Sequence, residues 1–208
     1  MVFERLRKHG LKLKPQKCHL LRERVGYLGH IVSRDGIETD PEKISKVTDW
    51  KRPTNAKEVL QFLGFSGYYR RFIKGYAAIA APLYRLTTGD PRKKIGKNTQ
   101  KCKPQPFLWT EECESSFNLL KKKLTTAPVL GYPDFSLPFV LQTDASIDGL
   151  GAVLAQTQGK HEHVIAYASR GLNPAETRYP AHKLEFLCLK WAVTEKFRIT
   201  SMATSLPF

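Results

Sequence analysis

Three strand patterns in succession, followed by one long apolar helix pattern, occupy the last third of the chain and limit the folds that it can adopt. Residues 137–143, 150–156 and 164–169 carry the strand patterns, and Asp148-Gly149 is a turn signal between the first two. Residues 180–197 carry the helix pattern. A doubly wound sheet requires strands and helices in alternation, whereas this order predicts an α+β fold.

The first ninety residues predict a different arrangement, in which a hairpin precedes several helices. Asp35-Gly36 favours the hairpin turn, Asp40 and Pro41 are typical of a helix start, and Asn55 with Glu58 resembles a capping box. From these signals and from periodicity, the expected elements are a helix end at 2–9, a strand at 25–32, its partner at 37–38, a short helix from residue 41, longer helices at 59–73 and 77–86, and a helix after Thr110.

Charge is distributed unevenly along the chain. Residues 1–130 hold 27 of the 34 Lys+Arg and 12 of the 19 Asp+Glu, whereas residues 131–208 hold 7 of each. The whole net charge of +15 therefore lies in the first region. Lys and Arg that neutralise phosphates release counterions, so a folded chain with this charge predicts a polyanionic partner, nucleic acid in preference to an anionic membrane.

Composition also bears on where the protein works. No apolar run approaches the roughly 18 residues that cross a bilayer, and residues 1–10 lack the apolar core of a signal peptide, so we expect neither membrane insertion nor secretion. Cys18, Cys102, Cys113 and Cys188 show no paired, zinc-type spacing. Free thiols in a reducing, intracellular compartment are expected, and the choice between cytoplasm and nucleus stays open.

A basic segment separates the two regions. Residues 87–105 are rich in Gly, Pro and Lys and contain six basic residues with no acid after Asp90. This composition predicts a linker or an exposed loop. A solvated loop is the simpler interpretation, and a nucleic-acid-binding element is the alternative.

Gly64 and Gly67 interrupt the longer helix, where each costs about 1 kcal/mol relative to Ala, so some other role must compensate. One helical stripe with its flanks comprises Gly64, Tyr68, Arg71, Arg70 and Lys74. A smooth patch beside an aromatic edge and cations suits a nucleic-acid groove. The alternative is that the glycines only let another helix pack closely.

Two carboxylates stand out in the second region. Asp144 lies at the end of the first strand pattern, and Glu185 lies inside a run apolar enough to be buried almost all round. Such a pair would offer the hard oxygen ligands that Mg²⁺ prefers. The alternative is a solvated Glu185 on an exposed helix stripe.

Several of these segments together resemble the Pol polyprotein of gypsy-like LTR retrotransposons, where the end of a reverse transcriptase joins the start of its RNase H domain. The similar motifs follow the family's order over about residues 1–197. They are KLKPQKC at 12–18, VGYLGHIVS at 25–33, GFSGYY at 64–69 with RRFI after it, FLWT at 107–110, APVLGYPD at 127–134, TDAS at 143–146, GAVLAQ at 151–156, AYASR at 166–170 and LEFLCLKWAV at 184–193.

The resemblance implies roles for the candidate residues. Tyr27, Leu28 and Gly29 correspond to the primer grip, and Gly64 and Tyr68 to the thumb helix that follows the minor groove of the template–primer duplex. Arg70, Arg71 and Lys74 flank that helix face as nucleic-acid-binding cations. Asp144 and Glu185 match the first two carboxylates of the RNase H site, which holds Mg²⁺ and cuts the RNA of an RNA–DNA hybrid.

The same resemblance implies a division into parts and a set of partners. The expected parts are a palm end with a primer-grip-like hairpin at 1–40, a helical thumb-like unit at 41–90, a basic linker at 91–106, a connecting helix with a truncated RNase H-like βββα unit at 107–197, and a divergent tail at 198–208. The implied partners are an RNA–DNA hybrid or another nucleic-acid duplex and the rest of a Pol polyprotein, with no membrane.

Two departures from the family pattern affect the expected activity. The polymerase motif YxDD is missing, and so is the third RNase H carboxylate, normally in a TD pair. We therefore expect a fragment related to RNA-directed DNA polymerase and ribonuclease H that handles duplex without catalysis of its own. A noncatalytic basic nucleic-acid-binding module is the alternative, and a barely stable chain with an exposed sheet edge is a third possibility.

Overall fold

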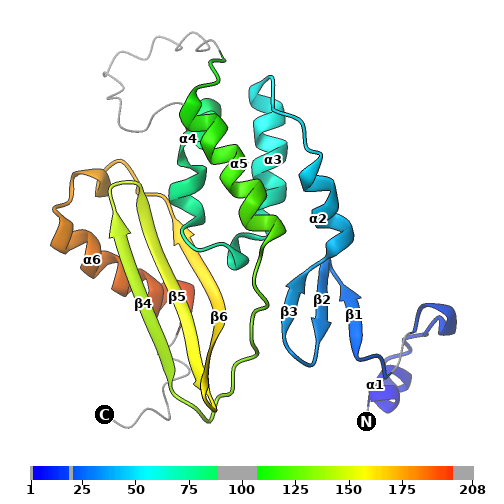
Figure 1. Ribbon diagram of the computed structural model, residues 1–208. Helices are drawn as coiled ribbons and strands as arrows, with labels where there is room; N and C mark the ends of the chain where they lie inside the picture. The colour runs from blue at the N-terminus through cyan, green and yellow to red at the C-terminus, as the bar shows by residue number, and fades with distance from the viewer. Residues whose placement is uncertain (1, 19–20, 89–106, 199–208) are drawn as a thin grey trace.

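The described part of the chain forms two three-stranded antiparallel sheets with a group of helices between them (Figure 1). The structure is a computed structural model that describes residues 2–18, 21–88 and 107–198. This mixture of helices and sheets, with the strands before the last helix, confirms the α+β prediction. The segment expected to be a basic linker, 91–106, and almost all of the tail expected at 198–208 lie outside the described residues.

The first sheet is a small meander near the N-terminus. A short helix, α1 (Val2–Lys8), and a 3₁₀ turn, η1 (Pro15–Lys17), precede it. Its strands pair in the order β1-β2-β3, and they are β1 (Arg24–Tyr27), β2 (His30–Ser33) and β3 (Ile37–Thr39). The predicted return of the chain after Asp35-Gly36 is confirmed by the pairing of Val32 with Ile37.

The prediction of one strand over 25–32 is wrong, because the chain reverses at Leu28-Gly29. Tyr27 pairs with His30, so the turn has two residues, and both have positive φ, 48° and 73°. A two-residue turn of this kind requires left-handed backbone at both positions, which Asn-Gly normally supplies. Leucine is an unfavourable residue there, so the sequence carried no turn signal.

The helices begin where the capping signals predicted. The side chain of Asp40 accepts a hydrogen bond from the Glu42 amide at the start of α2 (Pro41–Thr48). At α3 (Ala56–Tyr68), Asn55 accepts from the Glu58 amide at 3.0 Å and donates to the Glu58 carboxylate at 2.8 Å. The Glu58 carboxylate also accepts from the Thr54 amide at 2.7 Å, so the expected capping box forms with its returning backbone bond made one residue before the cap.

The longer helix, α3, ends at Tyr68 and does not continue to residue 73 as expected. The Tyr69 amide bonds to the carbonyl three residues back, and a 3₁₀ turn, η2 (Arg70–Phe72), follows. Gly75, with φ 69°, then leads into α4 (Tyr76–Thr88). Because residues 69, 72, 73 and 76 are buried in this turn as they would be in a helix, periodicity did not reveal the break.

A helix from beyond the undescribed segment completes the helical core. Thr110 caps α5 (Glu111–Thr125), which packs against α4 and α2. The rings of Phe62 on α3 and Phe117 on α5 lie 4.6 Å apart, and Leu120 and Leu124 are fully buried. α2, α3 and α4 therefore share one apolar core with α5.

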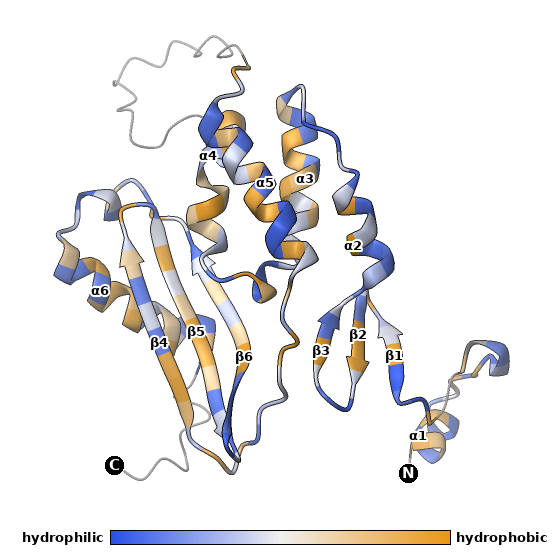
Figure 2. Cartoon of the chain, viewed as in Figure 1, coloured by the Kyte–Doolittle hydropathy of each residue, from blue (hydrophilic) through white to orange (hydrophobic). Residues whose placement is uncertain are grey.

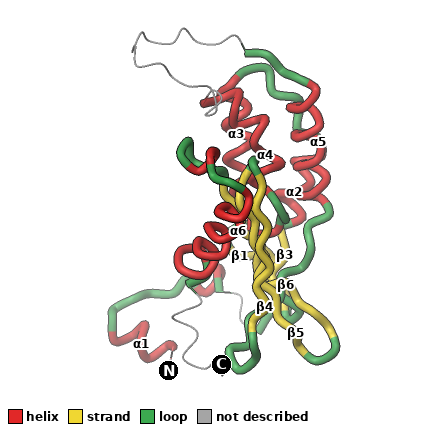
Figure 3. The backbone as a smooth tube through the Cα atoms, turned by 90° about the vertical axis from the view of Figure 1, so that its left-hand side faces the viewer, coloured by secondary structure: helices red, strands yellow, loops and turns green. Residues whose placement is uncertain are grey.

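The second sheet and its helix follow the predicted order. The strands are β4 (Phe139–Ser146), β5 (Gly149–Gln158) and β6 (His161–Arg170), paired as β4-β5-β6. A short turn, η3 (Glu176–Arg178), leads to α6 (Ala181–Lys190) and then to a π-helical turn, η4 (Trp191–Lys196). Apolar residues run along β5 (Figure 2), and α6 lies on one side of the sheet (Figure 3).

The helical group also touches the second sheet. α4 packs against β5 and β6, and η2 packs against β6. The Ala77 amide at the start of α4 donates to the Ser169 hydroxyl on β6 at 2.9 Å. The helical group and the second sheet therefore meet along α4 and β6.

An ion pair fixes the connection between β6 and α6. Two nitrogens of Arg170 contact the two carboxylate oxygens of Glu176 at 2.7 and 3.0 Å, and the Asn173 amide donates to the same carboxylate at 2.9 Å. The hydrogen bond from Arg170 is the main cause that lowers the pKa of Glu176, against the opposing effect of burial.

Among the described residues, no helix is both long and apolar enough to cross a membrane. Cys18, Cys113 and Cys188 are free thiols, as expected. Cys102 lies outside the described part of the chain.

The Glu176 ion pair should make stability depend on acid pH. The pKa of Glu176 in the folded protein is lowered from 4.5. The ion pair therefore contributes fully to stability at pH values above 4.5, and this contribution is lost as the pH falls through the folded-state pKa of Glu176. Glu176→Gln should reduce the free energy of unfolding at pH 7 by about 2 kcal/mol and weaken its acid dependence. Urea unfolding measures both effects, with Glu162→Gln on exposed β6 surface as control. Equal acid dependence in all three proteins would contradict this assignment.

Candidate nucleic-acid interface and carboxylate pair

The tip of the first hairpin projects apolar side chains outward. Tyr27 is 65% exposed and Leu28 is 70% exposed. Gly29 follows with φ 73°, and a Cβ at this position would lie 3.2 Å from the Tyr69 hydroxyl. The three residues expected to form a primer grip therefore occupy the last residue of β1 and a tight turn whose backbone lies close to the end of α3.

Two tyrosines at the end of α3 hold that turn. The Tyr68 hydroxyl donates to the Leu28 carbonyl, and the Tyr69 hydroxyl donates to the Gly29 carbonyl at 2.8 Å. The His30 ring lies 5.2 Å from the Tyr68 ring and 5.5 Å from the Tyr69 ring, centroid to centroid. Sequence reasoning identified Tyr68 but missed Tyr69 and His30, because a contact between residues 40 apart leaves no local pattern.

The outward face of α3 is smooth at Gly64. Beyond the adjacent residues and the backbone of α3 itself, no atom would lie within 4 Å of a Cβ at Gly64, whereas a Cβ at Gly67 would meet the Tyr76 hydroxyl at 3.4 Å. Leu60 and Tyr68, which lie on either side of Gly64 along this face, are each 52% exposed. The packing explanation therefore fits Gly67 but not Gly64.

The cations are arranged differently from the expected helical stripe. Arg70 and Arg71 belong to the 3₁₀ turn η2, because α3 ends before them, and Lys74 follows that turn. All three are exposed. Lys196 on η4 lies within electrostatic reach of Arg70 and Arg71, since burial chiefly, and then repulsion from these two arginines, lowers the pKa of Lys196. Positive charge from two distant segments thus gathers beside the end of α3.

The expectation that Glu185 is buried almost all round is wrong. Glu185 is exposed, and so are its neighbours Phe186, at 70%, and Leu189, at 45%. Only one face of α6 packs on the sheet, through Leu184 and Cys188. The sequence of α6 is apolar on both faces, so the pattern did not indicate which face is exposed.

Asp144 and Glu185 nevertheless lie on two elements that touch. The Cys188 thiol, three residues after Glu185, donates to the Asp144 carbonyl at 3.4 Å and to the Gly151 carbonyl at 3.2 Å. Burial chiefly raises the pKa of this thiol, and the negative charges of both carboxylates raise it further. Both acids are therefore near Cys188, and both are exposed to solvent.

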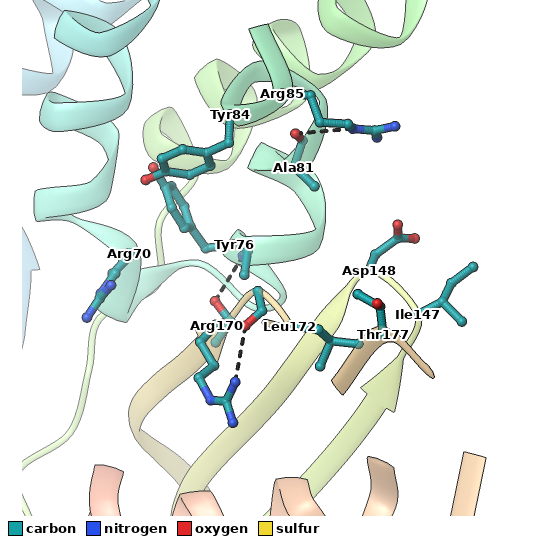
Figure 4. A pocket seen from close by; sticks show the side chains of 13 residues that line it. Arg70, Tyr76, Ala81, Tyr84, Arg85, Ile147, Asp148, Arg170, Leu172 and Thr177 are labelled. Carbon is teal, nitrogen blue, oxygen red and sulfur yellow. Dashed lines mark hydrogen bonds between the residues drawn. The ribbon is translucent and has the colours of Figure 1, made fainter. Parts of the chain in front are cut away.

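A cavity of about 360 Å³ opens between α4 and the second sheet (Figure 4). The rings of Tyr76 and Tyr84 lie close together on its α4 side, and Asp148 and Leu172 come from loops at the end of the sheet. Arg70 lines it as well. Sequence reasoning did not find this cavity, because its walls come from three separated segments.

Part of the sequence matches a known domain family, and the fold matches two solved structures. Residues 109–203 match the family described as the RNase H-like domain found in reverse transcriptase. Two solved foamy viral protease–reverse transcriptase structures share the fold at 23% identity. One, in complex with double-stranded DNA, has a TM-score of 0.73 over 99% of this chain and 40% of its own. The other, in complex with an RNA/DNA hybrid, has 0.69 over 92% and 24%.

The chain resembles the Pol polyproteins of gypsy-like retrotransposons, as its motifs predicted. It is 39% identical over 193 residues to the Pol polyprotein of transposon opus and 40% identical over 198 residues to that of transposon 297, both from Drosophila melanogaster. These alignments cover 93% and 95% of the chain. The chain spans only 19% and 17% of the two polyproteins.

Gly64 should be dispensable for folding. Since its missing Cβ would meet open space in a helix interior, Gly64→Ala should raise the free energy of unfolding by about 1 kcal/mol. Gly67→Ala is the matched control and should gain less, because its Cβ meets Tyr76. Chemical denaturation measures both changes. A destabilised Gly64→Ala variant would show that this glycine serves packing after all.

Proposed function

We propose that this chain binds an RNA–DNA hybrid duplex through the hairpin tip and the outward face of α3. The observation that carries the proposal is the open backbone at Gly64, flanked along α3 by exposed Leu60 and Tyr68. A glycine that costs helix stability and meets no neighbour suits close approach to a ligand. The exposed Tyr27 and Leu28 extend the same kind of surface onto the hairpin.

The chemistry of this surface suits a duplex minor groove. The minor groove of an A-form duplex is wide and shallow, so it admits a smooth helix face more readily than long side chains. Arg70, Arg71 and Lys74 lie just beyond the end of α3, where phosphate contacts would position the strand without reading its sequence. In the hairpin, Tyr27, Leu28 and Gly29 take the primer-grip role that the family resemblance implies.

The comparisons support a duplex ligand at the level of the fold. The two foamy viral proteins that share this fold are described in complex with RNA/DNA hybrid and with double-stranded DNA. The charge of this chain points the same way, since its whole net excess of +15 lies in residues 1–130. A hybrid is therefore the ligand to test first, and double-stranded DNA is the natural comparison.

For the RNase H-like part we propose a carboxylate pair without independent cleavage. Asp144 and Glu185 fit Mg²⁺ in kind, since both are oxygen ligands on touching elements. No third His, Cys, Asp or Glu groups with them among the described residues, so the pair would leave most of the coordination of Mg²⁺ to water and substrate phosphate. The function proposed for this chain is therefore duplex binding.

The binding proposal predicts a steep dependence on salt. The logarithm of the association constant for a hybrid should fall linearly with the logarithm of salt concentration. Arg71→Ala should reduce the slope by about one, and Lys160→Ala, in the neutral region, should leave it unchanged. Fluorescence anisotropy of a labelled hybrid measures the slopes. A flat salt dependence of the unaltered chain would contradict duplex binding.

The carboxylate proposal predicts binding without cutting. A hybrid labelled on its RNA strand and incubated with this chain and Mg²⁺ should remain intact, and Asp144→Asn should bind it as tightly as the unaltered chain does. Gel electrophoresis reports cleavage. Cleavage that Asp144→Asn abolishes would overturn the claim.

A second candidate function is a basic module that binds any polyanion. The charge distribution favours it, because such a module needs only positive charge. Enlarging Gly64 to Leu separates the two functions. This change should weaken hybrid binding at constant charge if the α3 face enters the groove, and it should have no effect on a binding module that relies on charge alone.

A further inference from the structure

We infer that Tyr69 is a positioning residue, whose hydroxyl holds the hairpin tip in the conformation that contacts the duplex. This inference rests on the proposed function and deepens it. Tyr69 does not itself face a ligand, since it is only 2% exposed. It can act only through what it holds, namely the Gly29 carbonyl at 2.8 Å.

The hairpin tip needs such support because the backbone conformation of its turn is energetically unfavourable. Leu28 has φ 48°, in the left-handed region that leucine rarely adopts, and most of its side chain is in solvent. A residue persists in such a conformation when its surroundings hold it there. Packing of the Leu28 side chain supplies little of that support, so hydrogen bonds to the turn backbone must supply it.

Those hydrogen bonds converge on two carbonyls. Leu28 O accepts from the Tyr68 hydroxyl and lies 3.0 Å from His30 Nδ1. Gly29 O accepts from the Tyr69 hydroxyl and from the Asp40 amide at 3.3 Å. The turn is thereby tied to the end of α3 and to the start of α2. Its outward side chains and the outward face of α3 are held as one surface.

The ring and the hydroxyl of Tyr69 have separable roles. The ring packs near Phe65 and Phe72, at centroid distances of 5.4 and 6.3 Å, and phenylalanine would fill the same space. Only the hydroxyl reaches the turn. Tyr69→Phe therefore removes the tie while keeping the apolar core.

The matched control is Tyr76→Phe. Tyr76 is 3% exposed, and its hydroxyl bonds to Ser66 at 2.9 Å, away from the hairpin. Loss of a buried hydroxyl from the same core affects stability in both variants. Only Tyr69→Phe should affect the tip.

The experiment has two measurements. Fluorescence anisotropy gives the affinity for the hybrid, and hydrogen exchange reports the protection of the Asp40 amide. Tyr69→Phe should weaken binding about tenfold, leave the salt slope unchanged and speed exchange at Asp40. Tyr76→Phe should change neither affinity nor that exchange. In a chain carrying Tyr27→Ala and Leu28→Ala, Tyr69→Phe should have no further effect on affinity, because the contacts that it positions are gone.

The possible failures are distinguishable. If the unaltered chain does not bind the hybrid, the proposed function falls and this inference falls with it. If the unaltered chain binds and Tyr69→Phe binds equally well, only the inference is overturned. Two other results also overturn the inference. One is an equal loss of hybrid affinity in Tyr69→Phe and Tyr76→Phe, and the other is a full additional loss of affinity when Tyr69→Phe is added to the chain carrying Tyr27→Ala and Leu28→Ala.

Discussion

The packing of one face of α3 into the apolar core that α4 and α5 share is the interaction on which the arrangement of this protein depends. The rings of Phe62 and Phe117 meet at 4.6 Å, and Val59 and Leu120 are fully buried in the same core. Once this face of α3 is covered, geometry directs the opposite face, with Gly64, to solvent. The candidate interface is therefore a consequence of the core, because a helix amphipathic enough to pack must leave one stripe free.

The same core explains how distant parts of the chain reach one site. The Lys121 ammonium on α5 donates to the carbonyls of Thr48 and Trp50, at 2.7 and 3.1 Å, and so ties the end of α2 to α5. β3 joins the arrangement through a bridge between Ile37 and Leu130. The hairpin is thus anchored at its base by the core and at its tip by tyrosines. Because both the base and the tip of the hairpin are held, the turn and α3 can form one rigid surface.

Local signals in the sequence predicted most of the fold. Strand patterns and the Asp148-Gly149 turn predicted β4 to β6, and Asp40, Asn55 and Thr110 marked helix starts, because these features act within a few residues. Three features depend on partners far along the chain, and the periodicity of the sequence does not predict them. They are the turn at Leu28-Gly29, the end of α3 at Tyr68 and the exposure of Glu185. The same limit applied to the site: Gly64 and Tyr68 stood out as a helical stripe, whereas Tyr69 contributes through one hydroxyl bonded to a residue 40 positions away.

The most direct test of the central claim is to map the backbone amides that respond when hybrid duplex is added to the isotope-labelled chain, by NMR. The account predicts that amides of the hairpin tip and of the outward face of α3, around Leu28 and Gly64, shift together and saturate at one concentration of duplex. Shifts confined to other parts of the chain, with Leu28 and Gly64 unmoved at saturation, would contradict it.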